Sequence, residues 1–217
     1  AEYRPQQLFS EALLMIEPRA NAKGLKLACE IDPRIPVNLY GDAMRIRQIL
    51  INLLTNAVKY TNEGKVTLSV QMIQVEEERA TLRFSVRDTG IGIREEDREL
   101  LFENFRRLDT TQNKGIEGTG LGLSITRKLL LLMDSDLCLQ SVYGVGSDFS
   151  FELRQEIIDA QEMGAFQKGT HLPADVSTYR EGFVAPDAKI LVVDDIDINL
   201  VVFKGLLKNS GMKIHTA

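Results

Sequence analysis

Two adjacent runs of alternating apolar and polar residues, 66–75 and 80–87, constrain the fold of this chain most strongly. Such alternation is typical of strands that bury one face, and the short acidic connection between the runs favours an antiparallel pair. The apolar positions are Val66, Leu68, Val70 and Met72 in the first run and Leu82, Phe84 and Val86 in the second. We therefore expect one face of this strand pair to lie in a core.

Helical patterns lie on both sides of the strand pair. Apolar residues recur at helical spacing over 7–17, with Ser10 and Glu11 on the outer side. The same period returns over 42–60, where Asp42 is a candidate N-cap. Two further helical stretches are expected, a charged one that ends at Phe105 and an apolar one over 121–133.

Other segments indicate strands and loops. Strand-like runs occupy 25–31, which Pro33 and Pro36 close, and also 137–142 and 147–153. Residues 109–120 lack any period and indicate a long flexible loop.

The pattern divides the chain into two units. We expect a first domain over 1–154 and a linker with several glycines and prolines over 155–188. From Lys189 a buried strand, an amphipathic helix and the start of a second strand indicate the opening of a βαβ unit over 189–217.

Composition excludes some classes of function. The formal net charge of −5 argues against nonspecific nucleic-acid binding, which normally needs a basic face. No apolar run approaches the roughly 20 residues that cross a bilayer, and the first residues lack a secretory signal. Cys29 and Cys138 lie in strand-like runs without metal-ligand spacing, so we expect both to be buried and reduced. We expect a cytoplasmic protein without direct membrane insertion.

The helix over 42–60 carries a polar stripe. At roughly 100° per residue, its members fall within about 80° of one another. They are Arg45, Gln48, Asn52, Asn56 and Lys59. An amide oxygen suits Mg²⁺ and a lysine can neutralise phosphate, but such a stripe is equally typical of a solvent-exposed helix face. The helix alone leaves both interpretations open.

Residues 88–93, Asp-Thr-Gly-Ile-Gly-Ile, follow a strand directly. Asp88 could accept a hydrogen bond from an exocyclic amine such as that of adenine, and Gly90 and Gly92 would let a planar ligand approach the main chain. An ordinary strand-to-loop turn explains the same residues.

A glycine-rich segment, 115–122, runs straight into the helix over 121–133. Free backbone N–H groups and the positive end of the helix dipole then face one point, which favours phosphate binding. The segment supplies neither the Gly-Lys-Ser/Thr of a Walker loop nor the glycine spacing of a Rossmann fingerprint. A second glycine pair, Gly144 and Gly146, fits a hairpin turn without a ligand.

In this order, the motifs over 7–154 closely resemble the catalytic ATP-binding domain of sensor histidine kinases. That domain shares its ATPase superfamily with DNA gyrase B, heat-shock chaperones and mismatch-repair ATPases. The matching motifs are NLLTNAVKYT (52–61), DTGIGI (88–93), FENF (102–105), GTGLGL (118–123) and GVGSDF (144–149). The resemblance implies a two-layer α/β sandwich, in which helices cover one face of a mixed sheet and ATP lies between the first motif's helix and a mobile lid.

The resemblance also implies a role for each matching residue. Asn56 would ligate the Mg²⁺ of ATP with Asn52 in the same shell, Lys59 would contact phosphate, and Tyr60 would pack beside the nucleoside. Asp88 would accept a hydrogen bond from the adenine amine. The other expected nucleotide contacts are Gly90, Gly92, Ile93, Gly118, Thr119, Gly120, Leu121, Gly122 and Arg107, with Arg106 as the alternative arginine for the γ-phosphate.

One departure from the hydrolysing relatives bears on the reaction. Where they carry a glutamate that activates water, this chain has Asn52, which cannot act as a general base. The resemblance therefore implies transfer of the γ-phosphoryl group to a histidine on a dimerisation hairpin. His171 and His215 lack that context, so we expect a monomeric chain that binds ATP but does not autophosphorylate.

The segment from Lys189 resembles the start of a receiver domain. Asp194 and Asp195 match its Mg²⁺-binding acids, followed by Asn199, and the phosphate-accepting aspartate would fall beyond Ala217. A plain βαβ opening explains the same residues. The expected parent is a hybrid histidine kinase, which could be membrane-anchored and whose partners would be its own histidine-bearing hairpin and a response regulator or receiver domain. The alternatives are a serine kinase of the anti-sigma-factor type and a nucleotide-binding docking module without kinase activity.

Overall fold

The computed structural model describes residues 1–98, 122–168, 185–192, 207 and 211–216. The chain forms two compact units, Ala1–His171 and Leu172–Ala217.

The first unit is built on a seven-stranded sheet. Its strands are β1 (Glu2–Tyr3), β2 (Lys26–Ile31), β3 (Pro36–Tyr40), β4 (Lys65–Glu76), β5 (Arg79–Asp88), β6 (Cys138–Val142) and β7 (Gly146–Glu162). The strand order is β1-β3-β7-β5-β4-β2, and β6 pairs with the beginning of β7. Because β2 and β4 are parallel and the other pairs are antiparallel, the sheet is mixed.

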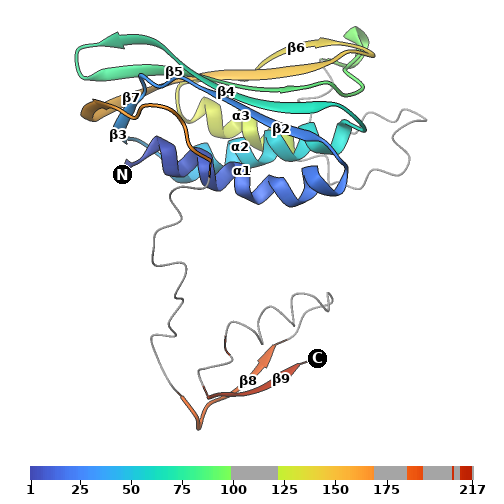
Figure 1. Ribbon diagram of the computed structural model, residues 1–217, viewed down its shortest axis with the longest axis vertical. Coiled ribbons are helices and arrows are strands. Elements are labelled where there is room, and N and C mark those ends of the chain that lie inside the picture. Colours follow the sequence, from blue (N-terminus) through green and yellow to red (C-terminus); the bar gives the residue numbers. More distant parts are fainter. Residues whose placement is uncertain (99–121, 169–184, 193–206, 208–210, 217) are drawn as a thin grey trace. The chain divides into compact units, whose positions relative to one another are not determined.

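Three helices cover one face of this sheet, as the implied fold requires (Figure 1). They are α1 (Pro5–Ala22), α2 (Ala43–Tyr60) and α3 (Gly122–Leu131), and a short 3-10 turn, η1 (Glu95–Asp97), follows β5. The α/β architecture with a mixed sheet and one covered face is confirmed.

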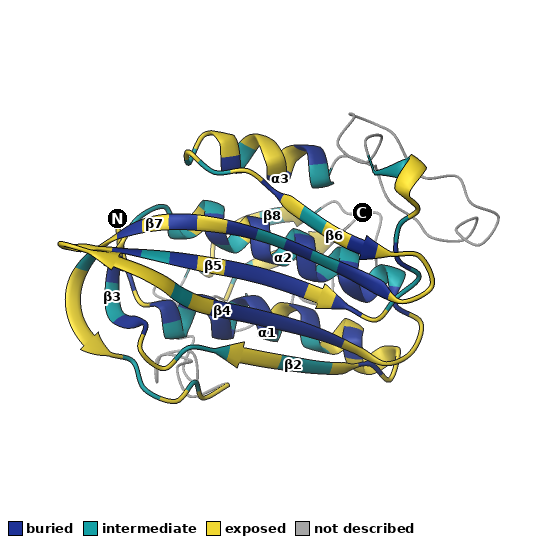
Figure 2. Cartoon of the chain, turned by 90° about the horizontal axis from the view of Figure 1, so that it is seen from above, coloured by how far each residue is buried: buried dark blue, intermediate teal, exposed yellow. Residues whose placement is uncertain are grey.

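The alternation along β4 and β5 is confirmed in register. Val66, Leu68, Val70, Leu82, Phe84 and Val86 are all buried (Figure 2). The alternate residues are polar: Gln71, Arg83 and Arg87 are exposed, whereas the small side chains of Thr67, Ser69 and Ser85 are buried among their neighbours. The ring of Phe84 stacks on Phe151 of β7 at a centroid distance of 4.8 Å and meets Phe9 of α1 edge-on at 6.1 Å. These aromatic contacts join the sheet to its helical layer.

The predicted orientation of Ser10 was wrong. Ser10 is only 1% exposed, and Glu11 pairs with Arg47 at 2.6 Å. The reason is that α2 packs beside α1, so α1 is covered on a second side as well as by the sheet.

The predicted burial of the two cysteines was also wrong. Cys29 and Cys138 are free, as expected, but both are exposed. Among the described strands, each belongs to one that pairs on one side only, β2 with β4 and β6 with β7, so neither has a neighbouring strand on its other edge.

The first unit also extends beyond the expected boundary at 154. Strand β7 continues to Glu162 and pairs with β3, which itself was not predicted because it begins at Pro36. Residues 163–168 remain in contact with the first unit. Met163 N–H donates to Ile35 O at 2.9 Å, and Lys168 Nζ lies 2.5 Å from Glu17 Oε1. The apolar pattern fades after 157 because the end of β7 is exposed on both faces.

In the second unit, β8 (Lys189–Val192) and β9 (Lys213–Thr216) are parallel neighbours. The two strands expected for a βαβ opening are therefore present. The helix predicted between them lies outside the described residues, as do Asp194, Asp195 and Asn199. None of the described helices has both the length and the apolar character needed to cross a membrane.

Candidate functional site

Helix α2 presents its polar stripe beside a deeply buried face. The Asp42 side chain caps the helix by accepting from Arg45 N–H at 3.0 Å. The buried face comprises Ile46, Ile49, Leu50, Leu53, Leu54, Ala57 and Val58. Asn52, Asn56 and Lys59 are half-buried, so the middle and end of the stripe differ from a freely solvated helix face.

Asn52 contacts the beginning of α3. Its Nδ2 donates to Thr126 Oγ1 at 2.6 Å, and Thr126 is buried. A Cβ atom added to Gly122 would lie 2.4 Å from Asn52 Oδ1, so the absence of a side chain at Gly122 lets the two helices meet. The first turn of the helix that follows the glycine-rich segment is therefore held against the polar stripe.

The carboxyl end of α2 lies against the loop that follows β5. Tyr60 O accepts from Ile91 N–H at 3.3 Å, and a Cβ atom on Gly90 would lie 2.3 Å from the same oxygen. Lys59 Nζ lies 4.9 Å from the centroid of the Tyr60 ring. Lys59 and Tyr60 therefore lie at the junction between α2 and the Asp88 loop.

Asp88 is a buried carboxylate at the end of β5, 7% exposed. Its Oδ1 accepts from Gly90 N–H at 2.8 Å. Burial raises the pKa of Asp88, while hydrogen bonds from the backbone N–H groups of Gly90 and Ser147 act in the opposite direction. A buried carboxylate of this kind can accept a further hydrogen bond strongly, because little water competes for it.

The β6–β7 hairpin supports the same loop from the other side. Gly146, at φ +142°, brings β7 so close that an added Cβ atom would lie 2.1 Å from Asp88 O. Gly92, at φ +64°, fits similarly against Val142 O. Ser141 Oγ accepts from Ile93 N–H at 2.8 Å and donates to Gly146 O at 3.0 Å.

The hairpin predicted at Gly144 and Gly146 is confirmed, with Val142 paired to Gly146 across it. The two glycines are nevertheless required for different structural reasons. Gly144, at φ +84°, has open space around it and serves the turn, whereas Gly146 serves the close contact with Asp88.

The structure gathers part of the predicted site. The site residues that the structure describes belong to α2, the end of β5 and the loop after it, or the start of α3: Asn52, Asn56, Lys59, Tyr60, Asp88, Gly90, Gly92, Ile93 and Gly122. Arg106, Arg107, Gly118, Thr119, Gly120 and Leu121 lie outside the described residues. Within the described part of the chain, no three His, Cys, Asp or Glu side chains are grouped to hold a metal ion.

Sequence reasoning missed Ser141 and Lys23, which make backbone contacts around this site. Ser141 lies in an ordinary strand pattern and Lys23 in a helix-to-strand connection. No signal in the sequence marked either residue.

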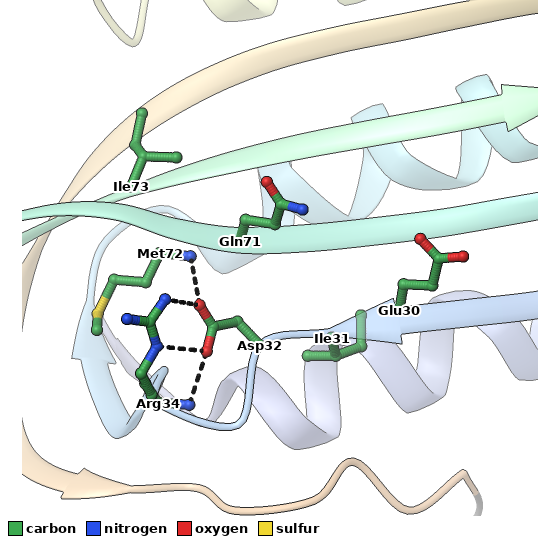
Figure 3. A pocket seen from close by; sticks show the side chains of 7 residues that line it. All are labelled: Glu30, Ile31, Asp32, Arg34, Gln71, Met72 and Ile73. Carbon is green, nitrogen blue, oxygen red and sulfur yellow. Dashed lines mark hydrogen bonds and ion pairs between the residues drawn. The ribbon is translucent and has the colours of Figure 1, made fainter.

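A separate pocket lies at the other end of β4 (Figure 3). It is lined by Glu30, Ile31, Asp32, Arg34, Gln71, Met72 and Ile73. Asp32 accepts from the Arg34 side chain at 2.7 and 3.0 Å and from Met72 N–H at 3.3 Å. The Arg34 hydrogen bonds lower the pKa of Asp32 to about 2. Asp88 lies opposite Val66 in the β4–β5 pairing, near the start of β4. The pocket is therefore separate from the site formed by the polar stripe of α2 and the Asp88 loop.

Residues 41–157 match the family model described as histidine kinase-, DNA gyrase B-, and HSP90-like ATPase. This range holds α2, the Asp88 loop, α3 and the β6–β7 hairpin, and it covers more than half of the chain. The chain belongs to this ATPase family.

Relatives of this ATPase domain include sensor and hybrid kinases. The chain is 37% identical over 147 residues to hybrid signal transduction histidine kinase B of Dictyostelium discoideum, covering 68% of the chain and 8% of that protein. It is 34% identical over 216 residues to sensor histidine kinase AruS of Pseudomonas aeruginosa, covering 100% of the chain and 20% of that protein. The chain thus spans a small fraction of these relatives.

Solved structures of histidine kinases are also similar to this chain. Full-length ShkA in complex with AMPPNP has a TM-score of 0.60 and 26% identity, over 100% of this chain and 40% of that one. The catalytic domain of histidine kinase ThkA has a TM-score of 0.58 and 28% identity, over 71% of this chain and 96% of that one.

Proposed function

We propose that residues 1–168 form the ATP-binding catalytic domain of a two-component sensor histidine kinase. The observation that carries this proposal is Asp88, a buried carboxylate that faces bare glycine backbone beside the half-buried stripe of α2. The kinase names of the relatives and the AMPPNP complex of ShkA support it.

The adenine amine would donate to Asp88, which discriminates bases because an unpaired buried carboxylate is costly. Gly90 and Gly92 leave no Cβ atom between the base and the main chain. Tyr60 would cover one side of the nucleoside. Lys59 would neutralise phosphate charge, and the start of α3 at Gly122 would face the phosphates with backbone N–H groups, together with Gly118, Thr119, Gly120 and Leu121.

Mg²⁺ fits the donors of α2 only as a metal shared with the substrate. Asn56 offers a neutral amide oxygen, and Mg²⁺ in phosphoryl-transfer sites is commonly held by one or two protein groups plus phosphate oxygens. When bound, Mg²⁺ would neutralise the charge that develops on the transferred phosphoryl group.

Asn52 supports transfer over hydrolysis. It has no basic group, and its Nδ2 already donates to Thr126 Oγ1. We propose that the γ-phosphoryl group passes to a histidine on the dimerisation hairpin of the same kinase, with Arg107, or else Arg106, stabilising its charge. Positioning and charge neutralisation would then supply most of the catalysis.

For the second unit we propose the start of a receiver domain in a hybrid kinase. The parallel pairing of β8 and β9 supports a βαβ opening, and Asp194 and Asp195 follow the end of β8 in the sequence. A response regulator or receiver domain would be the next phosphate acceptor.

The test measures Mg²⁺-ATP affinity by calorimetry and then phosphoryl transfer to an isolated histidine-bearing hairpin of a sensor kinase. Asn56→Ala should weaken Mg²⁺-ATP binding at least about tenfold, whereas the matched control Asn62→Ala, at an exposed asparagine after α2, should not. Phosphohistidine should appear on the hairpin and not on the chain itself. Tight ATP binding without transfer to any hairpin would instead indicate a docking module.

A further inference from the structure

Lys23 connects α1 to the carboxyl end of α2. It follows Ala22, the last residue of α1, and its Nζ donates to three backbone oxygens. The acceptors are Val58 O at 2.9 Å, Lys59 O at 2.8 Å and Thr61 O at 3.0 Å. All three belong to the last turn of α2 or to the residue that ends it.

The last carbonyl groups of a helix lack partners within the helix and carry the negative end of its dipole. An ammonium group has three donors and a full positive charge, so it satisfies both needs at once. The C-cap of α2, Thr61, is in extended conformation, so no left-handed glycine turn closes this helix end. The Thr61 hydroxyl donates to one carbonyl of this end, Ala57 O, at 2.7 Å. Lys23, the residue that ends α1, caps three further carbonyl groups there.

The turn that Lys23 caps contains Lys59 and Tyr60. Tyr60 O in turn accepts from Ile91 N–H, and Gly90 packs against the same oxygen. A single chain of contacts thus runs from Lys23 through the end of α2 to the loop that contains the Asp88 hydrogen bond.

We infer that Lys23 is a positioning residue for nucleotide binding, which holds Lys59, Tyr60 and the loop after β5 in place without touching the nucleotide. This inference rests on the proposed function of the site. It differs from a purely stabilising role, because it requires the affinity of the folded protein for ATP to depend on the Lys23 ammonium.

The experiment compares Lys23→Met, Lys23→Arg and the control Lys26→Met, which removes an exposed ammonium nearby, in the full chain. Mg²⁺-ATP affinity is measured by calorimetry well below each variant's unfolding temperature. We expect Lys23→Met to weaken binding about tenfold, Lys23→Arg to recover part of the loss because it keeps the charge, and Lys26→Met to match the parent.

Amide hydrogen exchange without nucleotide provides an independent readout. Lys23→Met should speed exchange at Ile91, which donates to Tyr60 O, and leave exchange at Val70, in the middle of β4, unchanged. Unchanged ATP affinity and unchanged Ile91 exchange in Lys23→Met would overturn the inference. Faster Ile91 exchange in a chain that never binds ATP would support the contact and instead refute the proposed function.

Discussion

Asn52 donates from Nδ2 to Thr126 Oγ1 across 2.6 Å, and this bond joins α2 to α3. The resemblance assigned Asn52 to the phosphate and metal shell, but its amide nitrogen is directed to a second helix. Asn52 therefore links the polar stripe to the helix that follows the glycine-rich segment, while Asn56 is the stripe's candidate Mg²⁺ ligand.

Thr126→Val tests this link. Valine keeps the shape of the side chain but leaves the Asn52 amide without its partner, so we expect the free energy of unfolding to fall by about 1–3 kcal/mol. ATP affinity should fall too, since α3 loses its hold on α2. Urea denaturation and calorimetry measure the two effects. Thr81→Val, on the strand β5, is the control, and an equal loss in both variants would count against a specific role for the bond.

The two hairpin glycines should respond differently to alanine. Gly146→Ala places a methyl group 2.1 Å from Asp88 O, so β7 or the Asp88 loop must shift. Gly144→Ala meets open space and bears only the strain of a positive φ, about 1–2 kcal/mol. We expect ATP binding to be lost in Gly146→Ala and retained in Gly144→Ala. Equal ATP affinities in the two variants would contradict the close-contact role of Gly146.

Asp88→Asn should separate folding from nucleotide binding. Because the pKa of Asp88 is raised in the folded protein, its contribution to stability falls as the pH rises through the window between its ordinary and its raised pKa. Asparagine carries no buried charge, so we expect the variant to be at least as stable as the parent at neutral pH. ATP affinity should nevertheless drop, because the amide presents a weaker acceptor.

If Asp88 accepts from the nucleotide as proposed, ATP binding should depend on pH. As the pH falls through the raised pKa of Asp88, protonation removes the acceptor and the parent should lose affinity. Asp88→Asn should lack this transition. Calorimetric titration of both proteins over a series of pH values provides the check, and parallel profiles would rule out Asp88 as the acceptor.

The contacts of Asp32 should make the free energy of unfolding fall in acid, independently of Asp88. Hydrogen bonds from Arg34 lower the pKa of Asp32 to about 2. Its stabilisation is therefore present above the ordinary aspartate value near 4 and is lost as the pH falls towards 2. Asp32→Asn should be less stable than the parent at neutral pH, with the difference shrinking in acid. A difference that stays constant with pH would refute this assignment, and ATP affinity at neutral pH should not change.

The end of the first unit can be tested by truncation. A chain of residues 1–168 keeps the β3–β7 pairing and the contacts of Met163 and Lys168, whereas one of residues 1–154 loses all of them. We expect 1–168 to unfold cooperatively like the parent and 1–154 to be markedly less stable. Thermal denaturation followed by circular dichroism distinguishes them, and equal midpoints would restore the boundary at 154.

Several elements could be predicted because their signals are local. The alternation along β4 and β5, the helical period of α2 and the Asp42 cap depend on residues that are neighbours in sequence. The edge exposure of Cys29 and Cys138, the burial of Ser10 and the strand β3 could not, because each depends on which distant segment packs beside it.

The sequence by itself determined which residues carry the candidate chemistry, since Asp88, Asn56 and the ordered glycines form motifs that need no coordinates. Only the tertiary structure decided how they are held. Asn52 donates a hydrogen bond to Thr126, Gly146 lies against Asp88, and Lys23 caps α2 from the residue that ends α1. These contacts join residues 35 or more positions apart in the chain. The partner of a hydrogen-bonding group at such a separation is set by packing, which no local pattern records.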